Sequence, residues 1–252
     1  MRTPRILLLA TVAGAALAIS SGCELIGQGD PFLRIHPFEF PHDSQGWTAD
    51  FSGYSASESA KSLSLTFEHR LLPEEADQTG TALYLAGHNR EQGNSLFMFV
   101  KRRVEDLAPN TAYRVHMTLK VTSTSPGKLC RTQTLPFDDP IRATIQAGAF
   151  SSEPTVKVRD GVHRFTVDRT RKAPVGRLAR VDTIEHSLRN CGFPGGFHVL
   201  RTYNHNDQVR VRTDSDGRLW AVVGLETLFG VKTTFYIKSI KLFVRGKEAP
   251  IR

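Results

Sequence analysis

Apolar and polar residues alternate with a period of two over much of the chain. Successive side chains of a β-strand point to opposite faces, so this alternation predicts strands with one buried face and one wet face. The clearest run covers 113–121, where Tyr, Val, Met, Leu and Val alternate with Arg, His, Thr and Lys. Further runs bring the expected number to about ten strands. They lie at 47–51, 63–67, 82–86, 141–149, 162–168, 209–213, 219–224 and 233–244.

The segment 96–100 has a different pattern, because its apolar residues face both ways. Leu96, Met98 and Val100 share one face, while Phe97 and Phe99 share the other. Strands that are buried on both faces read as continuous apolar runs. We therefore expect this strand to be covered on both sides or to lie centrally in its sheet.

Strands recur with turn signals between them, and no sustained helical period interrupts them. This order predicts an all-β protein, an antiparallel β-sandwich formed as a single domain. Segments 71–78 and 183–189 are the only helical candidates, each long enough for one or two turns. Trp47 and Trp220 lie inside strand patterns, so we expect both to pack in the core.

Two turns are predicted from their chemistry. Pro109 fixes φ and Asn110 tolerates left-handed geometry, which predicts a turn just before the long strand. The pair Asp216 and Gly217 lies between two strand patterns and predicts a β-hairpin.

The N-terminal residues have the pattern of an export signal. Arg2 and Arg5 precede an apolar run at 6–19, and the small residues 20–22 lead into Cys23. The apolar run is short for a transmembrane helix, although an N-terminal anchor helix remains the alternative. The order resembles the lipobox of bacterial lipoproteins, although that family prefers Leu at the position of Ser20.

The lipoprotein resemblance implies a division of the chain. Residues 1–22 would be a signal peptide, and Cys23 would be lipidated and become the new N-terminus. Residues 23–34 would form a tether, residues 35–247 the sandwich domain and residues 248–252 a tail. Glu24 in place of Asp implies sorting to the outer membrane under the enterobacterial pattern. The lipid anchor makes a membrane the first expected partner, because several acyl chains hold a protein stably on a bilayer.

Export also sets the redox context of the cysteines. With Cys23 lipidated, Cys130 and Cys191 form an even pair in an oxidising compartment, where a disulfide is the expected state. Two separate thiols remain the alternative, because the sequence does not show the distance between the Cα atoms. Neither cysteine has the local signature of a catalytic or metal-binding thiol.

The order of residues 107–115, Leu-x-Pro-Asn-Thr-x-Tyr-x-Val, resembles a turn-into-strand element of galactose-binding-like jelly rolls and carbohydrate-binding modules. The wider order also resembles a family of uncharacterised bacterial secreted proteins. It includes the segments 46–51, 83–87, 96–102, 148–154 and 216–220. The resemblance implies a jelly-roll fold and carbohydrate as a ligand class, but fold alone does not imply function.

Enzyme signatures are missing from the sequence, so we expect a non-catalytic protein. There is no G-x-S-x-G elbow, no H-E-x-x-H, no P-loop and no G-x-G-x-x-G. The carboxylate pairs Glu74 with Glu75 and Asp138 with Asp139 are neighbours in turn-rich stretches. A glycosidase needs its two carboxyl groups about 5 to 9 Å apart across a cleft, which adjacency does not supply.

The candidate ligand-binding residues are polar or aromatic residues outside the clear strand runs. Tyr54 and Tyr203 are candidates for stacking on a sugar ring, and His205 and Asp207 extend the polar loop that follows Tyr203. Asp214 and Asp216 offer oxygen atoms to a structural Ca²⁺, although a plain turn explains them better. No other cofactor is expected.

Charge adds one hint about partners. The chain has 252 residues and a formal net charge of +8, of which residues 23–252 carry +6. Basic groups lie at 101–103, 169–172, Arg210 and Arg212. They could meet acidic polysaccharide, lipopolysaccharide phosphates or anionic lipid headgroups, and export argues against nucleic acid.

Three functions remain open at this point. The first is a membrane-anchored, non-catalytic sandwich that binds carbohydrate or another envelope component. The second is a structural or assembly lipoprotein that binds another protein. The third is a glycan-acting hydrolase whose site the sequence does not reveal.

Overall fold

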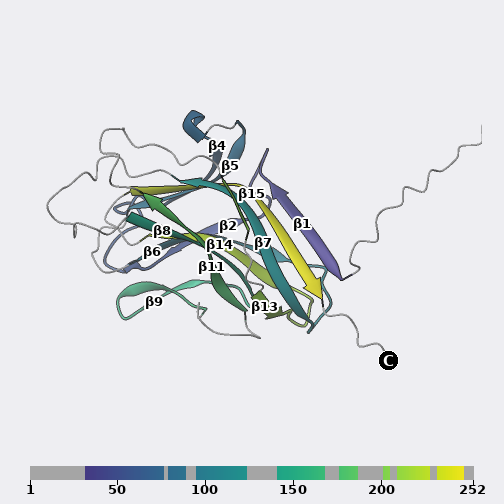
Figure 1. Cartoon of the computed structure of the whole chain (residues 1–252). Helices are drawn as coiled ribbons and strands as arrows, with labels where there is room; N and C mark the ends of the chain where they lie inside the picture. The colour runs from purple at the N-terminus through teal and green to yellow at the C-terminus, as the bar shows by residue number, and fades with distance from the viewer. Residues whose placement is uncertain are drawn as a thin grey trace, which may run out of the picture. The chain divides into compact units, whose positions relative to one another are not determined.

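The computed structural model describes residues 32–76, 79–88, 95–123, 141–167, 176–186, 201–204, 209–227 and 232–246. They belong to one compact unit, Phe32–Arg252. These residues form fifteen strands and a single 3₁₀ turn (Figure 1). The bounds are β1 Leu33–Glu39, β2 Thr48–Ser52, β3 Tyr54–Ser55, β4 Thr66–Leu71, η1 Glu74–Ala76, β5 Thr81–His88, β6 Leu96–Val104, β7 Ala112–Ser123, β8 Ile141–Phe150, β9 Val156–Arg159, β10 Val162–Phe165, β11 Gly176–His186, β12 Arg201–Asn204, β13 Val209–Arg212, β14 Leu219–Thr227 and β15 Lys232–Gly246.

The strands form three antiparallel sheets. A seven-stranded sheet has the order β12-β7-β15-β5-β4, with β1 added to β15 and β13 added to β7. A five-stranded sheet has the order β11-β8-β14-β6-β2, and a three-stranded sheet has the order β3-β10-β9. The two larger sheets lie face to face, and β9 of the third lies on the far side of the five-stranded sheet (Figure 1). The predicted all-β antiparallel β-sandwich is confirmed.

The main core fills the space between the two larger sheets. It consists of the inward-facing residues of both, such as Met117 and Leu119 on β7 and Val223 on β14, all fully buried. Trp47 is 1% exposed and packs edge-on against Phe38, with ring centroids 5.5 Å apart. The predicted core position of Trp47 is therefore confirmed.

The strand β6 is buried on both faces, as its apolar run predicted. Leu96 and Met98 belong to the main core, while Phe97 and Phe99 belong to a second cluster on the other face of the five-stranded sheet. Phe165 of β10 packs edge-on against Phe99 at 4.9 Å. The three-stranded sheet thus covers an apolar part of the five-stranded sheet and closes a second, smaller core.

The two predicted turns have different outcomes in the structure. Asn110 has a φ of 50°, which confirms the turn before β7. The turn at 214–217 forms, with the Gly217 amide donating to the Asp214 carbonyl at 3.2 Å. The predicted hairpin is wrong, because β13 pairs with β7 and β14 pairs with β6 and β8 in the other sheet. The turn therefore carries the chain from one sheet to the other.

The two helical candidates also differ. The 3₁₀ turn η1 lies within 71–78, as expected. The candidate at 183–189 is wrong up to residue 186, because β11 continues to His186 as the partner of β8. Pairing along a sheet edge outweighs the weak local helix preference of this segment. Across the described ranges, no helix is long and apolar enough to cross a membrane.

Candidate functional site

The structure places the two candidate tyrosines in different sheets. Tyr54 lies in β3 of the three-stranded sheet, and Tyr203 lies in β12 at an edge of the seven-stranded sheet. His205 and Asp207 lie outside the described residues, as do Cys23, Cys130 and Cys191. The structure therefore does not bring Tyr54 and Tyr203 together into one site.

Both tyrosines are half-buried, and each ring contacts a neighbouring part of the fold. The Tyr54 ring stacks on the His163 ring, with centroids 4.2 Å apart and planes 16° apart, so one of its faces is occupied. Burial raises the pKa of the Tyr54 hydroxyl, and the nearby charge of Asp50 adds to the shift. Tyr203 packs against the main core with part of its side chain.

Trp220 is a further half-buried aromatic residue, and its predicted core position is wrong because it belongs to neither hydrophobic core of the sandwich. Its side chain is half-buried and points to the outer face of the five-stranded sheet. Cross-strand pairing places Trp220 between Arg103 on β6 and Phe150 on β8. The apolar run at 219–223 could not show which face of β14 is less buried at the position of Trp220.

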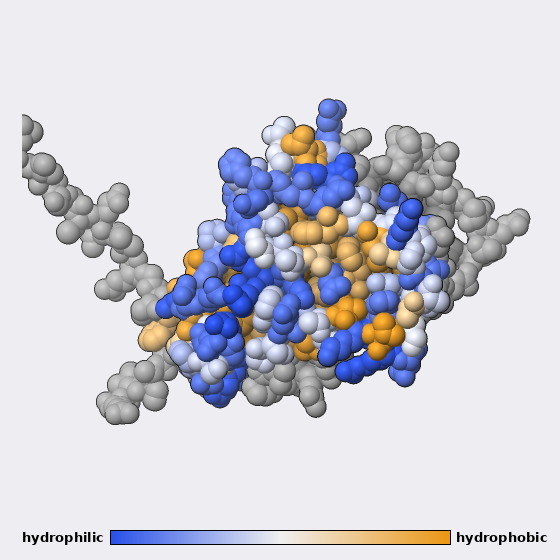
Figure 2. Space-filling view, turned by 180° about the vertical axis from the view of Figure 1, so that it is seen from behind, coloured by the Kyte–Doolittle hydropathy of each residue, from blue (hydrophilic) through white to orange (hydrophobic). Residues whose placement is uncertain are grey.

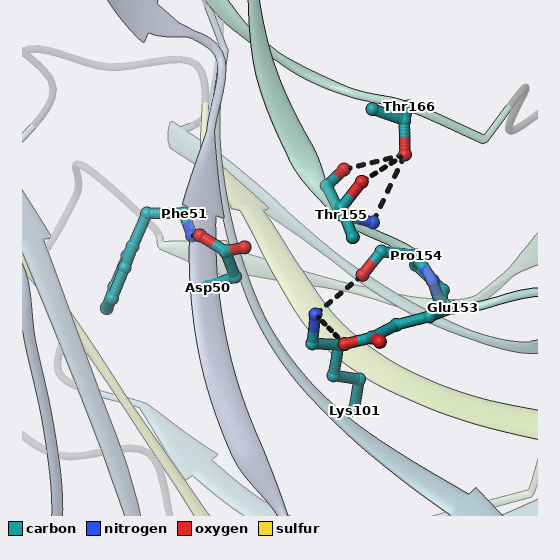
Figure 3. Close-up of polar contacts among 7 residues, drawn as sticks. All are labelled: Asp50, Phe51, Lys101, Glu153, Pro154, Thr155 and Thr166. Carbon is teal, nitrogen blue, oxygen red and sulfur yellow. Dashed lines mark hydrogen bonds and ion pairs between the residues drawn. The ribbon is translucent and has the colours of Figure 1, made fainter.

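A buried lysine lies beside this tryptophan. Lys101 of β6 is 8% exposed, and its Nζ lies 5.9 Å from the centroid of the Trp220 ring. The ammonium donates to the Pro154 carbonyl at 2.7 Å and pairs with the Glu153 carboxylate at 2.8 Å. Figure 3 shows the ammonium between these two oxygens. Two partners offset the cost of desolvating the Lys101 charge.

Two threonines hold the next part of the same segment. The Thr155 amide donates to the Thr166 hydroxyl at 3.1 Å, and this hydroxyl donates to the Thr155 carbonyl at 2.9 Å (Figure 3). The Thr166 amide donates to the same Thr155 carbonyl at 2.9 Å. The segment 153–155 is therefore fixed to β6 by Lys101 and to the end of β10 by Thr166, which sets the position of Glu153 near Trp220.

We call Trp220, Lys101, Arg103 and Glu153 the Trp220 face. Arg103 is half-exposed and pairs with Glu105 at 2.7 Å. The face thus combines a part-exposed indole with cationic donors and carboxylate acceptors whose positions are fixed by ion pairs. An apolar plane with polar groups at its edge is the arrangement that a sugar ring requires.

A second polar group lies farther along the same sheet face. The Glu226 carboxylate accepts from the Ser95 hydroxyl at 2.8 Å and from the Gln146 side-chain amide. Glu226 and Gln146 are half-buried on β14 and β8. This group extends the hydrogen-bonding surface but adds no further aromatic plane to the Trp220 face.

The candidate calcium ligands serve the turn between β13 and β14. The Asp214 carboxylate accepts from the Asp216 amide at 2.9 Å and from the Arg218 amide at 2.8 Å. Asp216 pairs with Arg218 at 2.9 Å. No group of three or more His, Cys, Asp or Glu side chains suited to a metal occurs among the residues that the structure describes.

Comparison with known proteins gives structural similarities only. No protein-family model matches the chain, and no curated protein matches its sequence. The structure is similar to a carbohydrate-binding module described for mannan recognition, TmCBM27, with 12% identity over 84% of this chain and 98% of the module, at a TM-score of 0.35. It is also similar to the xylan-binding module CBM15, with 13% identity over 86% and 99%, at a TM-score of 0.33.

A third similarity is to the enzymatically active domain of tailspike protein 4 from bacteriophage CBA120. It has 10% identity over 80% of this chain, at a TM-score of 0.30, and the chain spans only 20% of that domain. At these TM-scores we draw nothing about ligand or activity from the similarities. The proposals below rest on the residues of this chain.

Proposed function

We propose that this chain is a membrane-anchored, non-catalytic lipoprotein of the bacterial cell envelope whose sandwich binds carbohydrate at the Trp220 face. The half-exposed Trp220 on the outer face of the five-stranded sheet is the observation that carries the proposal. The expected export signal and Cys23 supply the anchoring part. Outer-membrane sorting follows from Glu24 by resemblance to lipoproteins.

The chemistry of the Trp220 face supports a neutral or mixed-charge sugar as its ligand. Lys101 and Glu153 neutralise each other, as do Arg103 and Glu105. A half-buried indole that lies outside the hydrophobic cores gains by stacking on the apolar face of a pyranose. The paired charged groups remain able to exchange hydrogen bonds with sugar hydroxyls at the rim.

The non-catalytic part of the proposal rests on the hydrogen-bonding and ionic partners of two carboxylates on the outer face of the five-stranded sheet. Glu153 pairs with Lys101, and Glu226 accepts hydrogen bonds from Ser95 and Gln146. A general acid needs a raised pKa and a general base needs access to water or substrate. Carboxylates held by cationic or hydrogen-bonding partners favour a structural role.

The test is a glycan array probed with the full chain in detergent, followed by titration of the strongest ligand. Trp220→Ala should weaken binding at least about tenfold, because an aromatic contact and its buried area are lost. Phe243→Ala is the matched control, since Phe243 is a half-buried aromatic residue on the other outer face. Tyr54→Ala and Tyr203→Ala should change binding less than Trp220→Ala.

A flat array would overturn the carbohydrate proposal. Equal losses in Trp220→Ala and Phe243→Ala would overturn the assignment of the site. Anchoring is tested separately, since Cys23→Ser should move the protein from the membrane fraction to the soluble fraction. Retention of the variant in membranes would contradict lipidation at Cys23.

A second candidate function, assembly with another envelope protein, is favoured by the apolar residues at the edge strands β2 and β4. Phe51 on β2, Phe67 on β4 and Leu65 just before β4 are only partly buried against the main core. Figure 2 shows apolar residues gathered in the middle of one side of the molecule, with hydrophilic residues around them. A photo-crosslinker at Phe67 in intact cells should then give one discrete product, which Phe51→Asp should abolish.

A further inference from the structure

The outer face of the seven-stranded sheet carries three arginines in one row across adjacent strands. Arg210 on β13 pairs with Arg114 on β7, and Arg114 pairs with Arg245 on β15. All three side chains are exposed. Like charges that lie directly opposite each other in a sheet destabilise it. An anion lying across the row would relieve this repulsion.

The neighbouring rows extend the positive charge. Lys241 is exposed on β15, two positions before Phe243, and Lys120 lies farther along β7. We call Arg114, Arg210, Arg245, Lys241 and Lys120 the basic face. This part of the sheet has four outward-facing cross-strand rows. The first contains Arg210 and the last contains Lys120. Among the described residues of these rows Glu39 is the one carboxylate, and it lies in the last row, opposite Ser239.

Apolar groups lie between the cations of this face. The His116 ring stacks on the Phe243 ring, with centroids 4.4 Å apart and planes 4° apart, and Lys241 Nζ lies 5.4 Å from the Phe243 centroid. Ile35, which is opposite Phe243 on β1, is 45% exposed. A surface that combines cations with exposed apolar side chains suits the boundary between lipid headgroups and acyl chains.

The chain enters the sheet at the same end as the arginine row. Leu33 pairs with Arg245, and the Gly246 amide donates to the Phe32 carbonyl at 2.9 Å. Cys23 lies nine positions before Phe32 along the chain. Fully extended, this stretch spans at most about 30 Å. A lipid on Cys23 would therefore keep the arginine row close to the bilayer and raise its effective concentration there.

We propose that the basic face lies against an anionic membrane surface, with lipid phosphates bound across Arg210, Arg114 and Arg245. Guanidinium groups bind phosphate oxygens in pairs, which a row of arginines at strand spacing can use repeatedly. Ile35 and Phe243 then contact the upper part of the acyl region. The inference rests on the anchoring part of the proposed function, and it leaves the Trp220 face, on the other sheet, turned away from the lipid.

The test measures vesicle binding of the full chain carrying Cys23→Ser, so that no acyl chain contributes. Co-sedimentation is measured with phosphatidylcholine vesicles and with phosphatidylcholine vesicles containing phosphatidylglycerol, at low and high salt. The test variant combines Arg114→Gln, Arg210→Gln and Lys241→Gln. The control combines Lys157→Gln, Arg159→Gln and Arg164→Gln, three exposed cations of the three-stranded sheet. Both variants lose the same charge.

We expect the anionic lipid to strengthen binding and high salt to remove the gain. The increase in vesicle affinity caused by the anionic lipid should be about a hundredfold smaller in the test variant. Three basic residues are changed, and each one near an anionic surface contributes about a factor of five. The control should keep most of it. Equal loss in both variants, or no dependence on the anionic lipid, would overturn the proposal. Binding to an acidic polysaccharide but not to these vesicles would also overturn it in favour of a glycan partner.

This outcome is separable from the anchoring proposal. Every chain in the vesicle assay lacks the lipidated cysteine, so a failure of lipidation at Cys23 does not change the comparison between variants. Thermal melts of both triple variants check that neither is unfolded. A test variant that melts with the control but loses vesicle binding supports the assignment of the basic face.

Discussion

The two sheets of the sandwich have outer faces of opposite character. On the five-stranded sheet, Phe97, Phe99 and Phe150 are fully buried beneath the three-stranded sheet. On the seven-stranded sheet, Phe243 is half-buried against His116, and cations on either side of it are exposed. The apolar run of β6 places phenylalanines on one outer face, where the three-stranded sheet covers them, whereas β7 alternates and carries polar residues on the other outer face. The face covered by the three-stranded sheet forms a second core, whereas the outer face of the seven-stranded sheet carries charged side chains.

The largest expected effect compares an aromatic residue from each outer face. Phe99→Ala should lower the free energy of unfolding by about 3 to 5 kcal/mol, because it leaves a cavity among Phe97, Phe165 and Val222. Phe243→Ala should cost less than about 1.5 kcal/mol, since its side chain is already part-exposed. Urea unfolding of the two variants measures the difference. Similar losses would mean that the three-stranded sheet does not seal a second core.

A second prediction concerns the glycine that leads into the three-stranded sheet. Gly53 has a φ of 91°, and a Cβ on it would lie 1.7 Å from the Ser95 carbonyl oxygen. Gly53→Ala should therefore cost about 2 to 3 kcal/mol in unfolding free energy, as strain and a backbone shift add. Gly161→Ala is the control, because Gly161 also has a positive φ but has nothing within 4 Å of its Cβ position. The control should cost about 1 kcal/mol.

If both glycine variants lose the same stability, backbone strain alone explains the effect and the close approach to Ser95 does not matter. Proteolysis adds a local readout. Gly53→Ala should speed cleavage near β9 and β10 more than Gly161→Ala does, because the Gly53 amide donates to the His163 carbonyl at 2.6 Å.

A smaller effect should follow from removing the buried lysine. Lys101→Met keeps most of the side-chain volume but loses the bonds to Glu153 and Pro154. The expected cost is about 1 to 2 kcal/mol, because a hydrogen bond from a charged donor is lost while Glu153 can still reach water. Glu153→Gln should cost less, since the Pro154 carbonyl still accepts from Lys101. A stability gain in Lys101→Met would mean that desolvation of the ammonium outweighs both contacts.

Periodicity predicted most of the long strands, because each buries one face against a large core. It missed five strands, each of which lies at the edge of a sheet: β1, β3, β9, β11 and β12. In such strands the apolar residues contribute little to the core, so the pattern is weak. The apolar run at 96–100 did predict a strand covered on both sides, but nothing local showed that residues 156–167 provide the cover.

The candidate site was less predictable than the fold. Trp220 looked like a core residue because it alternates with apolar neighbours, and only the path of the three-stranded sheet leaves it half-exposed. Lys101 and Glu153 lie more than fifty positions apart, so their ion pair depends on tertiary structure. Of the arginine row, only Arg210 was among the basic groups singled out from the sequence, because strand register decides which cations become neighbours.

The smallest predicted effect is a change in the pH dependence of stability that His116 contributes on the basic face. Burial lowers the pKa of His116 below its ordinary value of 6.5, and the charge of Arg245 lowers it further. Just below pH 6.5 the unfolded chain therefore takes up a proton at His116 more readily than the folded protein does. Its contribution to stability is complete above that pH and is lost as the pH falls.

His116→Gln should flatten this part of the pH dependence between pH 7 and pH 5. Solvent screening at a half-exposed side chain keeps the change below about 1 kcal/mol. His36, whose pKa is also lowered by burial, remains in both proteins and cancels in the difference. Arg245→Gln should reduce the same dependence without removing it, because burial of His116 persists. An unchanged pH profile in His116→Gln would show that the arginine row does not act on the His116 ring, and that Arg245 is screened by solvent from its neighbours.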